Sequence, residues 1–390
     1  MNQNTTTILS QLHEVLPMHE FEAFVGQHHA DRYVKRFSTE NQLSVLLYAQ
    51  ATEKDSLRAI ETGLRVQNRS WNSLGLTSVA RNTLAHANGK RSWEIFESLF
   101  YSLLKKCQNL TFGTAEFSFK NELYALDATV IDLCLSLFPW AKFRKRKGAV
   151  KIHALLNIRS QIPEFLVITD GKVHEVSIAK NMDFSQFPPE SIFVVDRGYT
   201  DYELLQAIKK AGHYFVIRLK SNARIMRYEQ MAPLGTGVIN DELIEFLNDE
   251  AREAYPGRLR LVTFYDAEHG QTYQFLTNEF NLSASNIALI YKQRWQVELF
   301  FKWIKQHLKI KTFLGTSKNA VMTQIWVAMI YFLLLAFIKY QTKFAGSLLD
   351  LSRMIAEVIL QKVHLIDLLS LTPKTMRRLK CRDNPQLQLF

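Results

Sequence analysis

Two aspartates interrupt or end segments that otherwise look like apolar strands. Asp127 lies within residues 124–129, and Asp196 follows the apolar run 192–195 where a strand should give way to a helix. Charge at such places is costly unless it is paired or binds a metal, and ligands bind at the carboxyl ends of strands in α/β sheets. Two carboxylates bridging divalent ions about 3.5 to 4 Å apart can activate water or a 3′ hydroxyl in phosphodiester chemistry. Because no His or Cys cluster accompanies these carboxylates, such a site favours Mg²⁺ or Mn²⁺ over zinc. Two such ions are expected.

Other acidic residues compete for this role, because some of the 37 Asp and Glu residues fall beside strands by chance. Asp132 has the opposite strand parity to Asp127, and Asp170 lies in an Asp-Gly turn. Asp201 could cap a helix, and Asp183 is a further competitor. On spacing alone, the pair Asp127 and Asp196 is therefore one hypothesis among several.

A long helix is expected from Ser283 to about residue 308, and one of its faces carries charge. Tyr291, Arg294, Glu298 and Lys305 stand at offsets 0, 3, 7 and 14, within an arc of about 60° at 100° per residue. Lys302 and Lys309 join that face. The opposite stripe is apolar and consists of Val297, Phe300, Phe301, Ile304 and Leu308. Glu298 could complete the metal site while the cations hold phosphates; the alternative is a simple ion pair with Lys302, four residues later.

The elements that must position these residues form an α/β pattern. Strands are expected at 124–131, 149–158 and 164–169 in antiparallel order, followed by a strand at 191–195, a helix at 200–211 and a strand at 214–219. The last three make a right-handed β-α-β unit. This order is typical of an RNase H-like (retroviral-integrase-like) fold. Residues 221–281 interrupt it as a β-rich insertion with a hairpin over 258–277.

Helices are expected on both sides of this region, which predicts three domains: 1–118, 119–345 and 346–390. Ser38 and Thr39 can cap a helix through residue 48, Asp55 another through residue 64, and Ser78 a third through residue 87. Two of these helices could form a helix-turn-helix-like DNA reader, or equally a small helical bundle with solvated arginines. The basic residues around the junction are Arg65, Arg69, Arg81, Lys90 and Arg91.

Composition limits the class of protein. A chain of 390 residues that is 47% hydrophobic is too large for a disulfide mini-scaffold and too apolar for a disordered tail. The net charge, 48 − 37 = +11, leaves both nucleic acid and a membrane surface open as partners. The apolar run 321–338 approaches the length of a membrane span, about 18 to 20 residues, but Thr323 and Gln324 interrupt it and favour a buried helix. Three unpaired cysteines and the polar N-terminus favour the cytoplasm.

The motifs together resemble a known family, the DDE transposases of bacterial insertion sequences. Residues 291–298, Tyr-Lys-Gln-Arg-Trp-Gln-Val-Glu, followed by Lys305, match the Tyr-Arg-Glu-Lys signature of the branch called the insertion sequence four group. The surroundings of Asp127, residues 148–153, residues 195–199 and residues 218–220 also resemble the family. The resemblance runs from about residue 122 to residue 340, and the N-terminal helices resemble the accessory domain often fused to such enzymes.

This resemblance implies cut-and-paste transposition by a nucleoid-associated bacterial enzyme. Asp127, Asp196 and Glu298 would be the catalytic metal ligands. Tyr291, Arg294 and Lys305 would contact the phosphate backbone of the element's terminal DNA, with Trp295 packed beside them. A metal-activated water would hydrolyse a phosphodiester at the element's end, and the freed 3′ hydroxyl would then attack target DNA. Pairing two DNA ends suggests a homodimer.

A run of cations between the first two strands is predicted to follow DNA phosphates close to the acidic residues, with a merely solvated loop as the alternative. Its members are Lys142, Arg144, Lys145, Arg146, Lys147 and Lys151.

The last five residues, Gln386 to Phe390, resemble the pentapeptide by which bacterial replication and repair proteins bind the sliding clamp. A tail folded back onto the protein is equally open.

Two rival functions remain. A structure-specific nuclease or resolvase of the same fold would use the same carboxylates without joining strands. A non-catalytic DNA-binding regulator would not need them.

Overall fold

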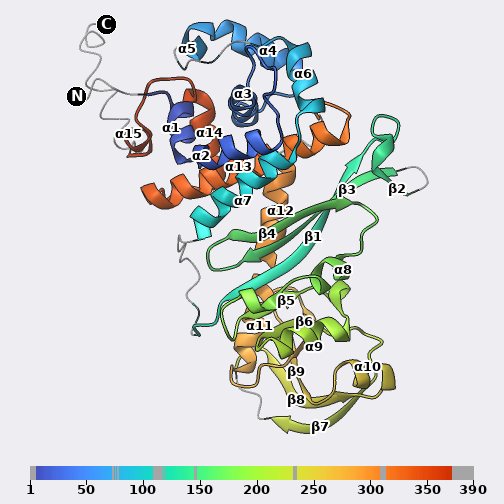
Figure 1. Cartoon of the computed structure of the whole chain (residues 1–390). Helices are drawn as coiled ribbons and strands as arrows, with labels where there is room; N and C mark the ends of the chain where they lie inside the picture. The colour runs from blue at the N-terminus through green and yellow to red at the C-terminus, as the bar shows by residue number, and fades with distance from the viewer. Residues whose placement is uncertain are drawn as a thin grey trace, which may run out of the picture. The chain divides into compact units, whose positions relative to one another are not determined.

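The computed structural model describes residues 6–72, 74, 76, 79–108, 117, 119–144, 147–231, 235–307 and 313–370, with the backbone alone at 144, 147, 307 and 370. The chain divides into two compact units (Figure 1). The helical unit contains residues 1–110 and 306–390, and the sheet unit contains residues 111–305.

The helical unit brings together helices from both ends of the chain. Its N-terminal helices are α1 (Ile8–Val15), α2 (Met18–Gln27), α3 (Thr39–Ala51), α4 (Leu57–Val66), α5 (Asn68–Asn72), α6 (Arg81–Lys90) and α7 (Glu94–Gln108). Its C-terminal helices are α13 (Lys318–Thr342), α14 (Leu348–Val358) and α15 (Leu365–Ser370). The helical character predicted for both ends agrees with these elements.

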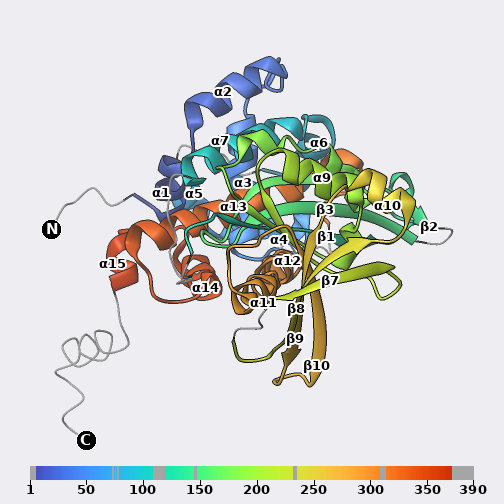
Figure 2. The same cartoon turned by 90° about the horizontal axis from the view of Figure 1, so that it is seen from below.

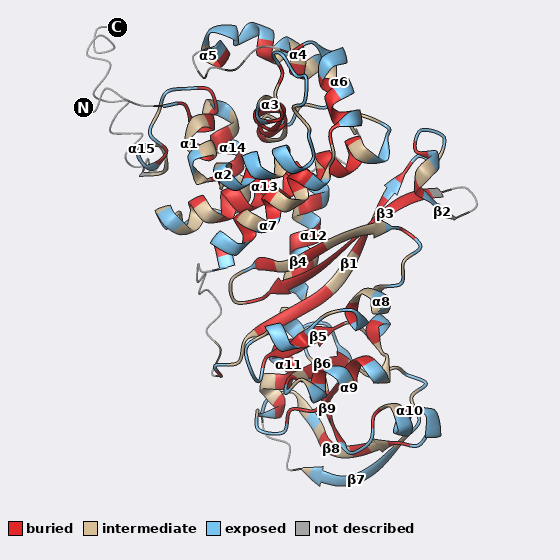
Figure 3. Ribbon diagram, in the orientation of Figure 1, coloured by how far each residue is buried: buried red, intermediate tan, exposed pale blue. Residues whose placement is uncertain are grey.

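Helix α13 is the centre of the helical unit and contains the apolar run of the sequence. It is long and apolar enough to cross a membrane, but 89% of its most apolar window is buried, against α3, α6, α7 and α14 (Figure 3). Trp326 packs on Phe100 of α7 with ring centroids 5.1 Å apart. The prediction of a helix buried on all sides is confirmed.

The structure therefore divides the chain differently from the predicted boundaries at 118 and 345. Helix α13 packs with the N-terminal helices α3, α6 and α7 and belongs to the same compact unit as they do. The physical reason is that α13 is apolar around its whole circumference, so it needs helices on several sides to cover it.

Helix caps refine two predicted starts. Ser38 caps α3 by accepting a hydrogen bond from the Asn41 amide, as predicted. Helix α4 is capped by Ser56 and not by Asp55. Helix α6 follows Ala80, which makes no side-chain cap bond, and the predicted cap Ser78 lies outside the described residues.

The sheet unit is built on a single ten-stranded sheet. Its strands are β1 (Leu123–Leu133), β2 (Lys142–Arg144), β3 (Lys147–Asn157), β4 (Ile162–Asp170), β5 (Ile192–Val195), β6 (Tyr214–Arg218), β7 (Ile225–Met231), β8 (Val238–Phe246), β9 (Leu259–Asp266) and β10 (Gln271–Thr277). Its helices are α8 (Glu175–Lys180), α9 (Tyr202–Lys210), α10 (Asp249–Ala254), α11 (Ala284–Gln293) and α12 (Trp295–His307), the last of which ends beyond the boundary of the unit.

Strand pairing follows the predicted order. Strand β3 pairs antiparallel with both β1 and β4, while β5 lies parallel to β1 and to β6. Helix α9 connects β5 to β6, which completes the expected β-α-β unit. The predicted insertion is not a separate body, because β10 pairs with β6 and extends the same sheet through β9, β8 and β7 (Figure 2).

A buried ion pair ties the added strands to the start of α11. Arg260 of β9 donates both to Asp241 of β8, at 2.8 Å from each carboxylate oxygen, and to the carbonyls of Glu279 and Leu282. Ser283 then caps α11. Every donor group of this guanidinium has a partner, so the insertion holds the helix that follows it in a fixed place.

The burial of α13 predicts a large loss of stability when its central aromatic residue is removed. Trp326→Ala leaves a cavity beside Phe100 and should lower the free energy of unfolding by about 3–5 kcal/mol, measured by chemical denaturation. Val66→Ala on α4, where the side chain is 78% exposed, should change it by less than about 0.5 kcal/mol. Equal effects of the two substitutions would contradict the burial.

Candidate active site

The strand register brings the two predicted aspartates together. Leu126 of β1 is paired with Val195 of β5 in parallel register; Asp127 is the next residue of β1, and Asp196 is the residue directly after the end of β5. Neighbouring residues in register point to the same face of a sheet. The two carboxylates therefore lie side by side, as the sequence predicted.

Local hydrogen bonds orient each aspartate. Asp127 Oδ1 accepts from the Ala128 amide at 2.8 Å, and Asp196 Oδ1 accepts from the Arg197 amide at 2.6 Å. Asp196 caps the 3-10 turn Arg197–Tyr199 that follows β5. In each aspartate this bond uses Oδ1 and leaves Oδ2 for a different partner, which for Asp127 is Arg294.

The predicted long helix is broken at Arg294, so the expectation of one continuous helix is wrong. Helix α11 ends at Gln293 and α12 begins at Trp295. The Arg294 amide donates to the Tyr291 carbonyl at 3.1 Å, and the Val297 amide donates to the Arg294 carbonyl at 3.0 Å. These bonds span three residues and tighten the chain locally. The apolar stripe of α12 from Val297 to Ile304 is buried, as predicted.

Arg294 lies between the carboxylates. Its Nη1 donates to Asp127 Oδ2 at 3.0 Å, and its Nη2 donates to Glu298 Oε1 at 2.5 Å. The Arg294 side chain is 15% exposed, and its Nε is buried with no hydrogen-bond partner in the part of the chain that is described. Asp127, Asp196, Arg294 and Glu298 thus gather in one place, although Glu298 pairs with Arg294 and not with Lys302.

The electrostatics of the cluster are those of crowded, half-buried like charges. Burial raises the pKa of Asp127 to about 6, with Asp196 and Glu298 adding to the rise and the Ala128 amide and Arg294 opposing it. Burial alone would lower the pKa of Arg294, but Tyr291, Asp127, Asp196 and Glu298 raise it above its usual value. The guanidinium therefore stays charged and compensates the carboxylates.

Tyr291 forms the other wall of the cluster. Its hydroxyl lies 3.5 Å from Asp196 Oδ1, and its ring packs on Phe275 of β10 with centroids 4.7 Å apart. Arg294 lies 5.8 Å from the centre of the same ring. The added strand β10 thus supports the tyrosine of the predicted site.

Two residues near the cluster were not assigned a role from the sequence. Tyr199 is buried, its hydroxyl has no hydrogen-bond partner among the described residues, and its pKa is raised by burial and by Asp127, Glu175 and Asp196. Its only sequence signal is its place three residues after Asp196. Arg218 at the end of β6 packs on Tyr273 at 4.8 Å and helps to lower the pKa of Tyr291 against the effect of burial.

The predicted DNA-contacting cations have different surroundings. Lys302 and Lys305 are exposed on α12, and Trp295 is 56% exposed beside Arg294. The β2–β3 hairpin contains the cationic run, but Lys145, Arg146 and the side chains of Arg144 and Lys147 lie outside what the structure describes.

The structure corrects the predicted position of Lys151. It lies inside β3 and not on the loop, and only 8% of it is exposed. Its Nζ donates to the Val173 carbonyl at 2.9 Å and stands 3.3 Å from Glu175. The pairing with a residue 24 positions later gives no local signal, which is why the sequence placed Lys151 with its basic neighbours.

The donor set fits a divalent cation. Asp127, Asp196 and Glu298 offer only carboxylate oxygens, and the cluster already holds one cation, the Arg294 guanidinium. Because Arg294 lies between Asp127 and Glu298, the three carboxylates of Asp127, Asp196 and Glu298 do not form a compact ligand group in the free protein. Within the described ranges, the group whose donor atoms all lie within 4.8 Å of one another is Asp266, Glu268 and His269. That group lies at the exposed turn of the β9–β10 hairpin. Its acidic side chains already have partners, because Asp266 bonds to His269 and Glu268 pairs with Lys292.

Comparison with protein families gives two matches. A family described as transposase DDE domain matches residues 118–334, which include Asp127, Asp196, Arg294 and Glu298. A domain family of unknown function, DUF4372, matches residues 4–77.

Curated relatives carry transposase names. A Geobacillus stearothermophilus protein named as the probable transposase for insertion sequence element IS5377 is 29% identical over 69% of this chain and 70% of its own length. A Sinorhizobium fredii protein, y4zB, also named as a transposase, is 34% identical over 66% and 71%. A Synechocystis protein named for insertion sequence element IS4SA is 26% identical over 78% and 85%.

The solved structures that are similar to this chain include a piggyBac transposase synaptic complex with hairpin DNA. The similarity has a TM-score of 0.41 and 14% identity, and it covers 77% of this chain and 59% of that one.

The raised pKa of Asp127 predicts a pH-dependent cost in the metal-free protein. The folded state binds this proton more tightly than the unfolded state, so stability present below pH of about 4 is lost as pH rises through about 6. Asp127→Asn should therefore gain stability relative to wild type across that window, by at most about 3 kcal/mol. Chemical denaturation in a chelator at several pH values measures this difference.

Asp183→Asn is the matched control. Hydrogen bonds from Ser185 and Gln186 lower the pKa of Asp183, so this variant should lose stability relative to wild type as pH rises. The same sign for both variants would refute the assignment of Asp127 as a destabilised carboxylate.

Proposed function

The chain belongs to the transposase DDE domain family, and from this premise we propose that it excises a bacterial insertion sequence and joins it to target DNA by a cut-and-paste reaction. Family membership makes the protein a DNA-cleaving transposase that requires a divalent metal. We further propose the identity of the ions, the roles of individual residues, the branch of the family and the course of the reaction. The observation that carries the proposal is the gathering of Asp127, Asp196 and Glu298 around Arg294.

We infer that the sheet unit is an RNase H-like core of the insertion sequence four group. The strand order β4-β3-β1-β5-β6, with β5 and β6 parallel to β1, supports the first part. The spacing of Tyr291, Arg294, Glu298 and Lys305 supports the second. The break at Arg294 does not disturb this signature, because it leaves Tyr291, Arg294 and Glu298 at the same cluster.

Asp127, Asp196 and Glu298 would hold two Mg²⁺ or Mn²⁺ ions. Bound there, the metal would activate the attacking water or 3′ hydroxyl and stabilise the leaving oxygen. Asp127 and Asp196 are fixed by their strands and by the amides of Ala128 and Arg197. Glu298 lies on a helix whose start is set by the turn at Arg294, so it is the ligand that can shift by a small local change.

Arg294 would exchange partners during the reaction. In the free protein it neutralises Asp127 and Glu298 and keeps them apart from each other. A DNA phosphate is an equally good bidentate partner for a guanidinium. Moving Arg294 from Glu298 to phosphate would place the DNA backbone beside the site and leave the carboxylates for metal.

Further phosphate contacts are proposed for Tyr291 beside Arg294, for Lys302 and Lys305 on the exposed face of α12, and for the β2–β3 hairpin cations Arg144, Lys145, Arg146 and Lys147. Lys151 would support that hairpin from inside β3, through Glu175 and Val173.

Two protein partners belong to the proposal. Pairing two element ends calls for a homodimer on DNA. Docking of Gln386–Phe390 in the bacterial sliding clamp rests on the sequence alone, since these residues lie outside the described part of the chain. A clamp pull-down unaffected by deleting the five residues would remove it. Both partners fit an enzyme acting on the nucleoid in the cytoplasm.

The central test is the joining of a pre-cleaved element end to plasmid DNA with Mg²⁺ or Mn²⁺. Wild type should join strands, whereas Asp127→Ala, Asp196→Ala and Glu298→Ala should each lose at least about a thousandfold in rate, because each removes a metal ligand worth several kcal/mol. Asp132→Ala, on the same strand as Asp127 but of opposite parity, is the matched control and should retain activity. Cleavage without joining would identify a nuclease or resolvase. DNA regulation that survives all three substitutions would identify a non-catalytic regulator.

If Arg294 and the metal compete for the same carboxylates, removal of the arginine should strengthen metal binding. With no DNA present, Arg294→Gln should bind Mn²⁺ about tenfold more tightly than wild type in calorimetric titration, because the competing cation is gone. Lys305→Gln, which removes an exposed cation of the same helix, should leave the metal affinity near wild type. Weaker Mn²⁺ binding by Arg294→Gln would show that Arg294 supports the metal site and does not compete with it.

A further inference from the structure

The helical unit contains a strongly basic hollow far in sequence from the acidic cluster. We call it the loop hollow; its volume is about 680 Å³, and its lining residues come from the segments 28–37 and 83–92. Its cationic lining residues are Arg32, Lys35, Arg36, Lys90 and Arg91, accompanied by three histidines. No Asp or Glu belongs to the lining. Such a surface attracts polyanions.

One of these cations builds the hollow. Arg91 is 9% exposed and donates to the carbonyls of Phe37 and Ser38 and to the side chain of Gln42. Asp31, 3.4 Å from Arg91, accepts from the amide and hydroxyl of Thr39. These contacts pin the α2–α3 loop between α3 and the end of α6, so the loop's shape is preset.

The other four cations face solvent. Arg32, Lys35, Arg36 and Lys90 are exposed, and in the described ranges none of them forms an ion pair with a carboxylate. Arg32 instead lies 5.0 Å from the ring centre of Tyr33, a side chain that is 86% exposed. Two neighbouring acids do not belong to the lining: Asp31 is 3.4 Å from Arg91, and Glu94 is 3.8 Å from His28. Exposed cations beside an exposed aromatic ring are typical of surfaces that bind nucleic acid.

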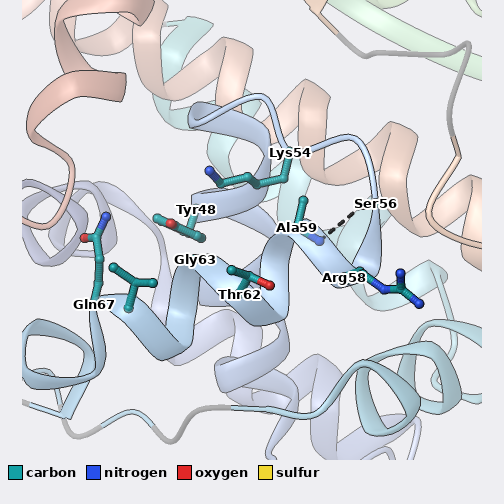
Figure 4. Close-up of a pocket in the computed structure, with 9 residues that line it drawn as sticks. Tyr48, Lys54, Ser56, Arg58, Ala59, Thr62, Gly63 and Gln67 are labelled. Atoms are coloured by element: carbon teal, nitrogen blue, oxygen red, sulfur yellow. Dashed lines mark hydrogen bonds between the residues drawn. The ribbon is translucent and has the colours of Figure 1, made fainter.

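A second hollow of the same unit gives the contrast (Figure 4). It has a volume of about 530 Å³ between α3 and α4, and its cations are Lys54 and Arg58. Lys54 lies over the Tyr48 ring at 6.0 Å, and Arg58 points away from that ring. This hollow does not gather charge, so the clustering of cations in the loop hollow is not a general property of the helical unit.

We propose that the loop hollow binds the phosphate backbone of double-stranded DNA through Arg32, Lys35, Arg36 and Lys90. Small-molecule sites are mostly apolar, and a single phosphate group does not need so many cations, whereas successive backbone phosphates use them all. The inference rests on the proposed function only for the identity of the polyanion. It gives the N-terminal region a DNA-holding role. Of the cations predicted around the junction, it keeps Lys90 and leaves out Arg65 and Arg69, and it adds three cations of the α2–α3 loop.

The test compares two full-length variants of equal charge. The hollow variant carries Arg32→Gln, Lys35→Gln, Arg36→Gln and Lys90→Gln. The control variant carries Arg58→Gln, Arg65→Gln, Arg69→Gln and Lys105→Gln, which are exposed positions of the same unit outside the loop hollow. Binding of a fluorescent duplex is measured by anisotropy from 50 to 200 mM salt in a chelator, with thermal unfolding as the check on folding.

The hollow variant should lose about tenfold or more in affinity at 50 mM salt, and the slope of log affinity against log salt should fall by about 3. The control variant should stay close to wild type. Equal losses of affinity in both variants would show that any exposed cations of the unit contribute equally, which would contradict a specific site at the loop hollow. No change in the hollow variant would also overturn the proposal.

Two further readouts separate the alternatives. The duplex should protect Lys35 and Lys90 from reductive methylation, and sodium triphosphate at equal ionic strength should not. Protection by triphosphate alone would show that the hollow binds small anions and would overturn the DNA assignment. Because binding is measured without metal, failure here leaves strand joining untouched, and failure of strand joining leaves this binding result standing.

Discussion

The sheet unit depends on one electrostatic constraint: several carboxylates share a small, half-buried space, and one arginine compensates them. Asp127 and Asp196 are forced together by the parallel register of β1 and β5. Glu298 arrives from α12, and the Arg294 guanidinium spans the gap to Asp127. Removing such charges from water is costly unless they are paired, so this arrangement is stable only while a cation is present. The need for a cation makes the cluster suitable for metal.

Two arginines of the sheet unit illustrate the difference between a structural and a functional ion pair. Arg260 is almost fully buried, and both Asp241 oxygens and two carbonyls satisfy its donor groups. Arg294 makes one bond to each of two carboxylates and leaves its Nε without a partner among the described residues. The first arrangement fixes α11 in place. The second leaves the guanidinium able to change partner, which the proposed exchange with phosphate requires.

Most of the site could be predicted from the sequence because its signals are local. A charge at the end of an apolar strand marked Asp196, and helical spacing brought Tyr291, Arg294 and Glu298 to one face. The break at Arg294 could not be predicted, since the hydrophobic period continues through it and the Arg294 side chain bonds to Asp127, a residue of a strand distant in sequence. Lys151 was misplaced for the same reason, because its partner Glu175 lies on another element. The grouping of α13 with the N-terminal helices was also hidden, because a helix that is apolar on all sides does not indicate which elements cover it.

The most direct test of the acidic cluster is to locate a bound metal by the damage it causes. With Fe²⁺ in place of the natural ion and ascorbate and peroxide added, hydroxyl radicals cut the backbone close to the iron. We expect cuts near Asp127, Asp196 and Glu298 that are suppressed by excess Mg²⁺ and absent in Asp196→Ala. Cuts confined to the turn at Asp266–His269, or spread evenly along the chain, would contradict a catalytic metal site at the Arg294 cluster.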